Sequence, residues 1–169
     1  MTLADVCKRE VVFVNREVTV HAACKLMRHY HVGSLVVVDE VADEGGDAIA
    51  KVSGDDRPRV PVGIVTDRDI VVEVYALELD PKVMTAGDIM SPDLVTVPES
   101  LAVADTIEVM RAGGVRRLPV VNEDNRLVGI VTIDDLLAVL AAQLSGIAHV
   151  VSRDPGYEGN DNHARLARK

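Results

Sequence analysis

An internal repeat limits the possible folds of this chain more strongly than any other feature of its sequence. Residues 63–69, Gly-Ile-Val-Thr-Asp-Arg-Asp, return 66 positions later as Gly-Ile-Val-Thr-Ile-Asp-Asp at 129–135. Further towards the N-terminus the offset between copies is 83 positions, and Met27 corresponds to Met110. The change of offset means that the first copy carries 17 additional residues. Since a unit of this size is marginal alone, the repeat predicts two similar substructures that pack together.

Each copy shows the same succession of hydrophobic patterns: a leading segment, a short strand, a helix, two buried strands and a closing helix. In the first copy these elements are expected at residues 3–7, 11–14, 18–30, 34–38, 60–65 and 67–79. In the second copy they are expected at residues 86–90, 94–97, 101–112, 117–121, 127–131 and 133–144. Ser100 is the expected N-cap of the helix at 101–112. The order β-α-β-β-α, found twice, predicts an α+β fold of two small sheets, each with helices on one face.

The repeat also predicts the domain boundaries. We expect a first repeat at residues 1–80, a second repeat at 81–145, and a polar tail at 146–169 that is mobile unless it docks on a partner. The additional residues form an acidic, glycine-rich loop inserted at 39–59. A solvated loop is preferred over a calcium site there, because the ligand spacing of the helix–loop–helix calcium motif is absent.

Composition excludes several classes of function. The net charge of −9 argues against duplex nucleic acid as a partner, and an aromatic content of 2% leaves few platforms for stacking bases. The N-terminus lacks a signal-peptide pattern, and no uninterrupted apolar run approaches the roughly 20 residues of a membrane span. We therefore expect a cytoplasmic protein with no membrane partner.

Catalytic and metal-binding patterns are also missing from the sequence. Cys7 and Cys24 do not form a disulfide framework and are interpreted as small core thiols. The five histidines show no metal-ligand spacing, and no Ser-His-Asp or Cys-His arrangement is recognisable. The sequence therefore predicts that the protein is not an enzyme and requires no cofactor.

The repeated Thr-x-x-Asp motif has the chemistry of a ligand site. Thr132 is predicted to cap a helix that follows a buried strand, with Asp135 in its first turn. Such a helix start presents free amides, a positive dipole end, a hydroxyl and a carboxylate, which together suit a polar, partly anionic ligand. Thr66 and Asp69 repeat the pattern. For all four residues simple helix capping is the alternative interpretation.

These motifs resemble the cystathionine-β-synthase (CBS) domain pair, or Bateman module, of the stand-alone bacterial type. The resemblance extends over residues 3–144 and also rests on the segments 32–38 (Val-Gly-Ser-Leu-Val-Val-Val), 115–121 (Val-Arg-Arg-Leu-Pro-Val-Val) and 87–90 (Gly-Asp-Ile-Met). It implies tandem CBS repeats packed with pseudo-twofold symmetry through their sheets, two clefts between the repeats, and a homodimer. It also implies adenosine-containing ligands such as AMP, ADP, ATP, S-adenosylmethionine or NAD-type molecules.

The resemblance further implies two sets of ligand-binding residues. In a first cleft, Asp135 would hold the ribose hydroxyls, Thr132 would meet phosphate or ribose oxygen, and Arg117 with Arg116 would contact phosphate. The adenine in this cleft would lie near Cys7, Val12, Val32 and Gly33. The second cleft would use Thr66, Asp69 and Ser34, with Arg68 as the compensating cation and Met90, Val95 and Val115 across from them.

Two functions are consistent with these features. The first is a regulatory module that senses adenosine nucleotides, as in energy sensing through AMP or ATP, and signals to an unknown effector protein by a conformational or dimer change. The alternative is a structural or protein-interaction module whose clefts are unoccupied. On the first hypothesis we expect the Thr132/Asp135 cleft to take the phosphorylated ligand, because Gly33 and Ser34 stand in the first copy where the second has Arg116 and Arg117.

Overall fold

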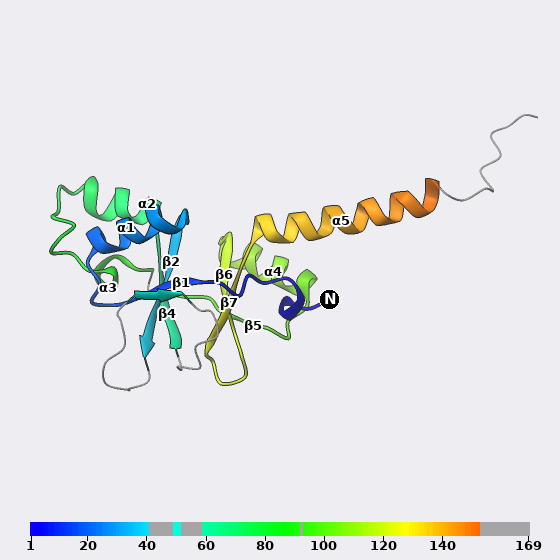
Figure 1. Ribbon diagram of the computed structural model, residues 1–169, viewed down its shortest axis with the longest axis horizontal. Helices are drawn as coiled ribbons and strands as arrows, with labels where there is room; N and C mark the ends of the chain where they lie inside the picture. Colours follow the sequence, from blue (N-terminus) through cyan, green and yellow to red (C-terminus); the bar gives the residue numbers. More distant parts are fainter. Residues whose placement is uncertain (41–48, 52–58, 92, 153–169) are drawn as a thin grey trace, which may run out of the picture. The chain divides into compact units, whose positions relative to one another are not determined.

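The computed structural model describes residues 1–40, 49–51, 59–91 and 93–152 (Figure 1). It divides into a compact unit, Met1–Leu136, and a second unit, Leu137–Lys169. The segments 41–48 and 52–58 of the expected acidic loop, and 153–169 of the expected tail, lie outside the described residues. Both sheets belong to the first unit, so the α+β class predicted from the repeat is confirmed there.

The first repeat forms a four-stranded sheet in the order β3-β1-β2-β4. β1 (Val12–Asn15) pairs in parallel with β2 (Ser34–Glu40), which pairs antiparallel with β4 (Arg59–Thr66). Side chains along β4 alternate between buried and half-buried, as expected for a strand with one face in the core. β3 (Ile49–Lys51) adds an antiparallel edge strand that the sequence analysis did not predict, within the range expected to be a loop.

The first helix of the first repeat begins two residues later than expected, and the second begins as expected but differs in form. α1 (Val20–Tyr30) is capped by Thr19, whose hydroxyl accepts a hydrogen bond from the Ala22 amide at 3.3 Å. A regular helix was expected at 67–79. The chain instead forms one α-helical turn, α2 (Asp67–Asp69), followed by a π-helix, η2 (Ile70–Tyr75).

The second repeat forms a three-stranded sheet in the order β5-β6-β7. β5 (Val97–Pro98) is parallel to β6 (Arg117–Val121), which is antiparallel to β7 (Leu127–Thr132). α4 (Val103–Gly113) begins later than expected, so its N-cap is Ala102, without a side-chain hydrogen bond, and not Ser100. α5 (Ile133–Ser152) continues beyond the predicted end of its helix at 144.

The leading segments of the two repeats are exchanged. η1 (Leu3–Asp5) packs on the second repeat, where the Leu3 amide donates to the Leu101 carbonyl at 2.9 Å. α3 (Ala86–Ile89) packs on the first, where the Ala86 amide donates to the Val18 carbonyl at 2.7 Å. Leu3 is fully buried in the core of the second repeat, and Ala86 in that of the first. Each repeat is therefore completed by a segment from the other.

A third buried cluster contains residues of both sheets. It consists of Val11, Phe13, Val36, Val38 and Leu127, with the half-buried Ile130 packed against it. Phe13, the one phenylalanine of the chain, has no exposed surface. The contact between the sheets is therefore built largely from aliphatic side chains, in agreement with the low aromatic content.

Helix α5 is long and apolar enough, by length and composition alone, to cross a membrane. Its 20 residues are not an uninterrupted apolar run, because Asp134 and Asp135 lie in its first turn and further polar residues follow. One such helix in the described part of the chain is weak evidence for a membrane span.

Candidate functional site

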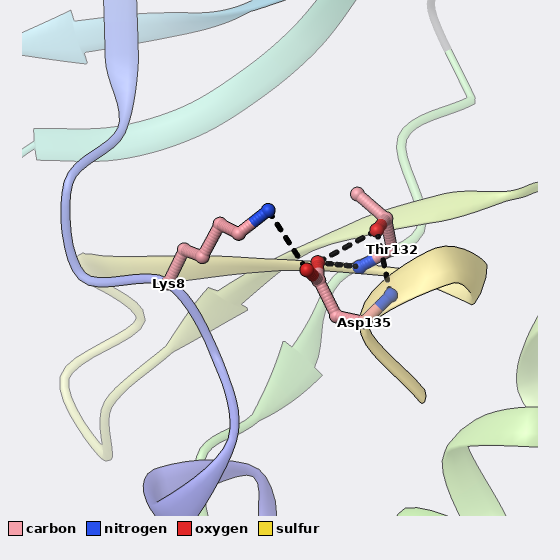
Figure 2. Close-up of polar contacts among 3 residues, drawn as sticks. All are labelled: Lys8, Thr132 and Asp135. Carbon is pink, nitrogen blue, oxygen red and sulfur yellow. Dashed lines mark hydrogen bonds and ion pairs between the residues drawn. The ribbon is translucent and has the colours of Figure 1, made fainter. Parts of the chain in front are cut away.

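The start of α5 is closed by a reciprocal capping box (Figure 2). The Asp135 amide donates to Thr132 Oγ1 at 3.2 Å, while Asp135 Oδ2 accepts from the Thr132 amide at 3.0 Å and from the Thr132 hydroxyl at 2.6 Å. This arrangement is expected where a threonine precedes an acidic residue by three positions at the end of a strand. One carboxylate oxygen of Asp135 is therefore committed to the helix start.

The second oxygen of this carboxylate is bound by Lys8. Lys8 Nζ lies 2.8 Å from Asp135 Oδ1, and the side chains are 65% and 15% exposed, respectively (Figure 2). Burial acts to raise the pKa of Asp135, but the hydrogen bonds from Lys8 and Thr132 outweigh it and hold the pKa below its usual value. Lys8 is held in place because its amide and carbonyl both pair with Ile130 at 2.9 Å. We call Lys8, Thr132 and Asp135 the α5 site.

The start of α2 has the same capping box without the lysine. Asp69 Oδ2 accepts from the Thr66 amide at 2.7 Å and from the Thr66 hydroxyl at 2.8 Å, and the Asp69 amide donates to Thr66 Oγ1 at 3.2 Å. No ion pair involves Asp69 within the described part of the chain. The residue corresponding to Lys8 is Ser91, whose amide donates to the Ile64 carbonyl at 3.1 Å.

A pocket of about 290 Å³ includes Ile64, two residues before Thr66, in its lining. It is lined by Ile64, Ser91, Asp93, Leu94, Val95, Val115, Arg117 and Leu118. Ile64 and Thr66 are both half-buried and alternate with buried residues along β4, so their side chains lie on the same face of the sheet. We call this pocket, together with Thr66 and Asp69, the α2 pocket.

Arg117 lines the α2 pocket and, as the first residue of β6, also pairs with Thr132 of β7. Arg117 also approaches Gly33 of the first repeat. If a Cβ atom were placed on Gly33, Arg117 Nη1 would lie 4.0 Å from it and Asp67 Oδ2 would lie 3.4 Å from it. The Gly33 carbonyl accepts from the Asp67 amide at 3.2 Å, at the start of α2. Arg117 therefore reaches from the second repeat to a helix start of the first.

At the start of α5, Arg116 takes the position that Gly33 has at the start of α2. Its carbonyl accepts from the Ile133 amide at 2.9 Å, and its side chain is exposed. Arg116 precedes β6, whereas Arg117 is the first residue of that strand.

The apolar residues named for the two clefts fall into distinct environments. Val95 and Val115, both expected in the second cleft, line the α2 pocket together. Val12 is buried in the core of the first repeat, and Val32 packs at the edge of that core. Cys7 and Met90 are packed against glycines of the opposite repeat, since a Cβ on Gly129 would lie 2.8 Å from Cys7 Sγ and one on Gly63 would lie 2.3 Å from Met90 Sδ.

The remaining polar residues lie near the start of α2. Ser34 is half-buried and pairs with Thr66 across β2 and β4. Arg68 is exposed, and its amide donates to Asp67 Oδ1 at 2.8 Å. Sequence reasoning did not single out Lys8 or Asp93. The signal for Lys8 was present, because the 83-residue offset places a serine at its counterpart and so marks a difference between the two helix starts.

Metal binding finds no support in the described ranges, where no group of three or more histidine, cysteine, aspartate or glutamate side chains could hold an ion. The chemistry of both helix starts is instead that of hydroxyl and carboxylate acceptors near a cation. Such groups bind and orient a polar ligand through hydrogen bonds.

Comparison with protein families identifies two matches to the model described as CBS domain, at residues 3–76 and 86–142. Among curated proteins, the chain is 35% identical over 135 residues to Hypoxic response protein 1 of Mycobacterium tuberculosis, covering 80% of this chain and 82% of that protein. It is 33% identical over 139 residues to an uncharacterised protein of Methanopyrus kandleri, covering 82% of this chain. The chain spans 62% of the length of the Methanopyrus protein.

Solved structures show the same fold. A crystal structure of Hypoxic Response Protein I with two coordinated zinc ions matches with a TM-score of 0.63 and 33% identity, over 82% of this chain and 98% of that one. The CBS domain pair of protein MJ0100, in complex with 5′-methylthioadenosine and S-adenosyl-L-methionine, matches with a TM-score of 0.64 and 24% identity. That match covers 85% of this chain and 98% of the other and supports the fold alone.

Proposed function

The chain belongs to the CBS domain family, with one domain match in each repeat, and from this premise we propose that it is a regulatory module that binds an adenosine nucleotide of the AMP, ADP or ATP class. The module acts by binding and carries out no catalysis. The observation that carries this proposal is the α2 pocket, where Arg117 lies beside a Thr-x-x-Asp helix start.

The groups at this pocket match the three parts of an adenosine nucleotide. Asp69 Oδ1 makes no hydrogen bond or ion pair with the described residues and can accept from ribose hydroxyls. Arg117 supplies a permanent positive charge for phosphate. Val95 and Val115 provide apolar surface for the base. The volume of about 290 Å³ is close to the lower end of the range for small-molecule pockets.

A protein of the same fold suggests the adenosine part of the proposal. The CBS domain pair of MJ0100 was crystallised with two compounds that both contain adenosine. The phosphate part rests on Arg117 alone, and for this reason we propose the α2 pocket as the principal site. This reverses the order expected from the sequence, in which the Thr132/Asp135 cleft was to hold the phosphorylated ligand.

The position of the pocket between repeats gives binding a route to regulation. Ile64 comes from the first repeat, whereas Val95, Val115 and Arg117 come from the second. A ligand held by both repeats favours the arrangement that it fits, and it stabilises the folded chain by mass action. We propose that this change is passed to an effector protein, directly or through a homodimer.

Isothermal titration calorimetry with AMP tests the ribose contact. Asp69→Asn should weaken AMP binding at least tenfold, because a neutral amide replaces the carboxylate acceptor. Asp135→Asn is the matched control, since it alters an equivalent capping box at the other helix start. Equal loss of affinity in both variants would show that helix capping and not ribose binding is responsible, and would contradict the assignment.

A second pair of variants tests the phosphate contact. Arg117→Gln should weaken the binding of AMP but leave the binding of adenosine nearly unchanged, because adenosine lacks the phosphate. Arg116→Gln, which removes the neighbouring exposed cation, should affect neither ligand. If the wild-type chain binds none of AMP, ATP, S-adenosylmethionine and NADH at millimolar concentration, the proposal fails in favour of a protein-interaction module.

A further inference from the structure

The two Thr-x-x-Asp helix starts differ at Oδ1 of the aspartate, which is paired with Lys8 in Asp135 and has no partner among the described residues in Asp69. We propose that Lys8 is a built-in occupant of the α5 site, which keeps nucleotide out of that site and directs it to the α2 pocket. The inference rests on the proposed function, which it deepens by adding an autoinhibitory residue. It predicts one nucleotide per chain although the Thr-x-x-Asp motif is present twice.

The geometry at Asp135 leaves too few acceptor positions for a ribose diol that donates two hydrogen bonds. Oδ2 accepts two hydrogen bonds from Thr132, and Oδ1 lies 2.8 Å from Lys8 Nζ, so one of the roughly four positions of the carboxylate remains (Figure 2). A diol that donates both hydroxyls to Asp135 must displace the ammonium group and thereby replace a charge-assisted hydrogen bond by a neutral one. Because Asp135 is only 15% exposed, water replaces the lost charge partner poorly.

The equivalent oxygen at the α2 pocket is open to a ligand. Asp69 Oδ2 is committed to Thr66 in the same way, but within the described residues neither a hydrogen bond nor an ion pair reaches Oδ1. The chain position that carries Lys8 in one repeat carries Ser91 in the other, and Ser91 itself lines the pocket. The serine hydroxyl is too short to bridge the distance that a lysine spans. The difference between Lys8 and Ser91 therefore decides whether the aspartate at a helix start is paired with a cation of the chain itself.

The backbone holds the lysine at this place in the absence of ligand. Lys8 pairs with Ile130 through both its amide and its carbonyl, one strand position from Val131 and two from Thr132. The neighbouring Arg9 forms an ion pair with Glu99 instead, with Arg9 Nη1 at 2.9 Å from Glu99 Oε2. The two cations therefore have separate partners, and Arg9 provides a control for the loss of positive charge in the same segment.

Reciprocal substitutions test the proposal. We expect calorimetry with AMP to give one site per wild-type chain, two sites for Lys8→Ser, and none for Ser91→Lys. Opening the α5 site should strengthen AMP binding there by about tenfold, the effect of removing one competing charge-assisted hydrogen bond. The site gained in Lys8→Ser should disappear again in Lys8→Ser/Asp135→Asn. Arg9→Ser, with the same change in charge, should retain a single site.

Each outcome separates this inference from the proposed function. One site in both the wild type and Lys8→Ser overturns the role of Lys8 but leaves nucleotide binding in place. Two equal sites in the wild type, of which Lys8→Ser loses one, show that Lys8 is a cation that binds phosphate and overturn the inference. A site that appears only in Lys8→Ser supports the inference and contradicts the proposed use of the α2 pocket. An absence of binding in every variant overturns both.

Discussion

At the scale of single residues, Asp135 has two structural roles before any ligand is considered. It caps α5 through Thr132 and it pairs with Lys8, and these hydrogen bonds outweigh the effect of burial and lower its pKa. A carboxyl group whose pKa is lower in the folded than in the unfolded chain stabilises the fold above the unfolded pKa. That contribution is lost as the pH falls through the folded pKa.

Asp135→Asn should therefore destabilise the protein at neutral pH and matter less in acid. We expect a loss of about 1 kcal/mol in the free energy of unfolding at pH 7, which is typical of a lost cap. The difference between the variant and the wild type should shrink below about pH 4, where the carboxyl group of the unfolded chain becomes protonated. Urea unfolding at several pH values measures it, and a difference that stays constant down to pH 2 would contradict the assignment.

Sequence reasoning identified the residues whose partners are close in the chain. Thr132 and Asp135, like Thr66 and Asp69, are three positions apart, and the capping boxes follow from that spacing. Lys8 was missed, and the approach of Arg117 to the α2 pocket was not predicted, because both depend on which strands of the two repeats come together. Lys8 meets Asp135 across 127 positions, and Arg117 reaches Gly33 across 84. No local pattern carries that information.

At the scale of elements, strand β6 was predicted with its observed bounds, and the elements that differ have local physical reasons. Strand β3, Ile-Ala-Lys, is too short to show a periodicity of its own and forms by pairing with β1. The helix expected at 67–79 becomes π-helical where isoleucine and three valines occur within Ile70–Tyr75. Branching at Cβ restricts such side chains in a regular α-helix and weakens its preference for that form.

The contacts between leading segments and strands give a prediction about two glycines. A Cβ on Gly129 would lie 2.8 Å from Cys7 Sγ and 3.0 Å from the Lys8 carbonyl oxygen, and one on Gly63 would lie 2.3 Å from Met90 Sδ. Both Gly→Ala substitutions should destabilise the protein, by about 1–3 kcal/mol. The two substitutions should differ in how much stability a second substitution restores. Met90→Ala removes the two nearest atoms, Sδ and Cγ, and leaves its own Cβ at 3.0 Å, so it should restore part of the stability of Gly63→Ala. Cys7→Ala should restore less of the stability of Gly129→Ala, because the Lys8 backbone oxygen at 3.0 Å is held by its pairing with Ile130.

Chemical denaturation of the four single and two double variants measures these couplings as double-mutant cycles. Equal rescue at both glycines would show that the Lys8 backbone moves aside at little cost. That result would also weaken the argument that pairing with Ile130 fixes the position of Lys8. The glycine cycle therefore tests the framework of the α5 site without any ligand.

At the scale of the whole molecule, the exchange of leading segments joins the repeats into one folding unit. Leu3, from the first repeat, has no exposed surface in the core of the second, and Ala86, at the start of the second repeat, is equally buried in the core of the first. Loss of either core should therefore remove support from the other. This coupling is also what a regulatory module requires, since a ligand that binds at one helix start then affects both repeats.

Leu3→Ala tests this coupling because its side chain and the fluorescent reporters lie in different repeats. The chain has no tryptophan, and in a Tyr157→Phe background only Tyr30 and Tyr75, both in the first repeat, remain as tyrosines. Removing a buried leucine should cost about 2–5 kcal/mol. If the repeats unfold together, the transitions seen by tyrosine fluorescence and by circular dichroism shift equally.

Leu79→Ala, at a 40% exposed position, is the control and should change little. A fluorescence transition that stays in place while part of the dichroism signal is lost would mean that the second repeat unfolds alone, and that the exchanged segments do not transmit the effect of a ligand.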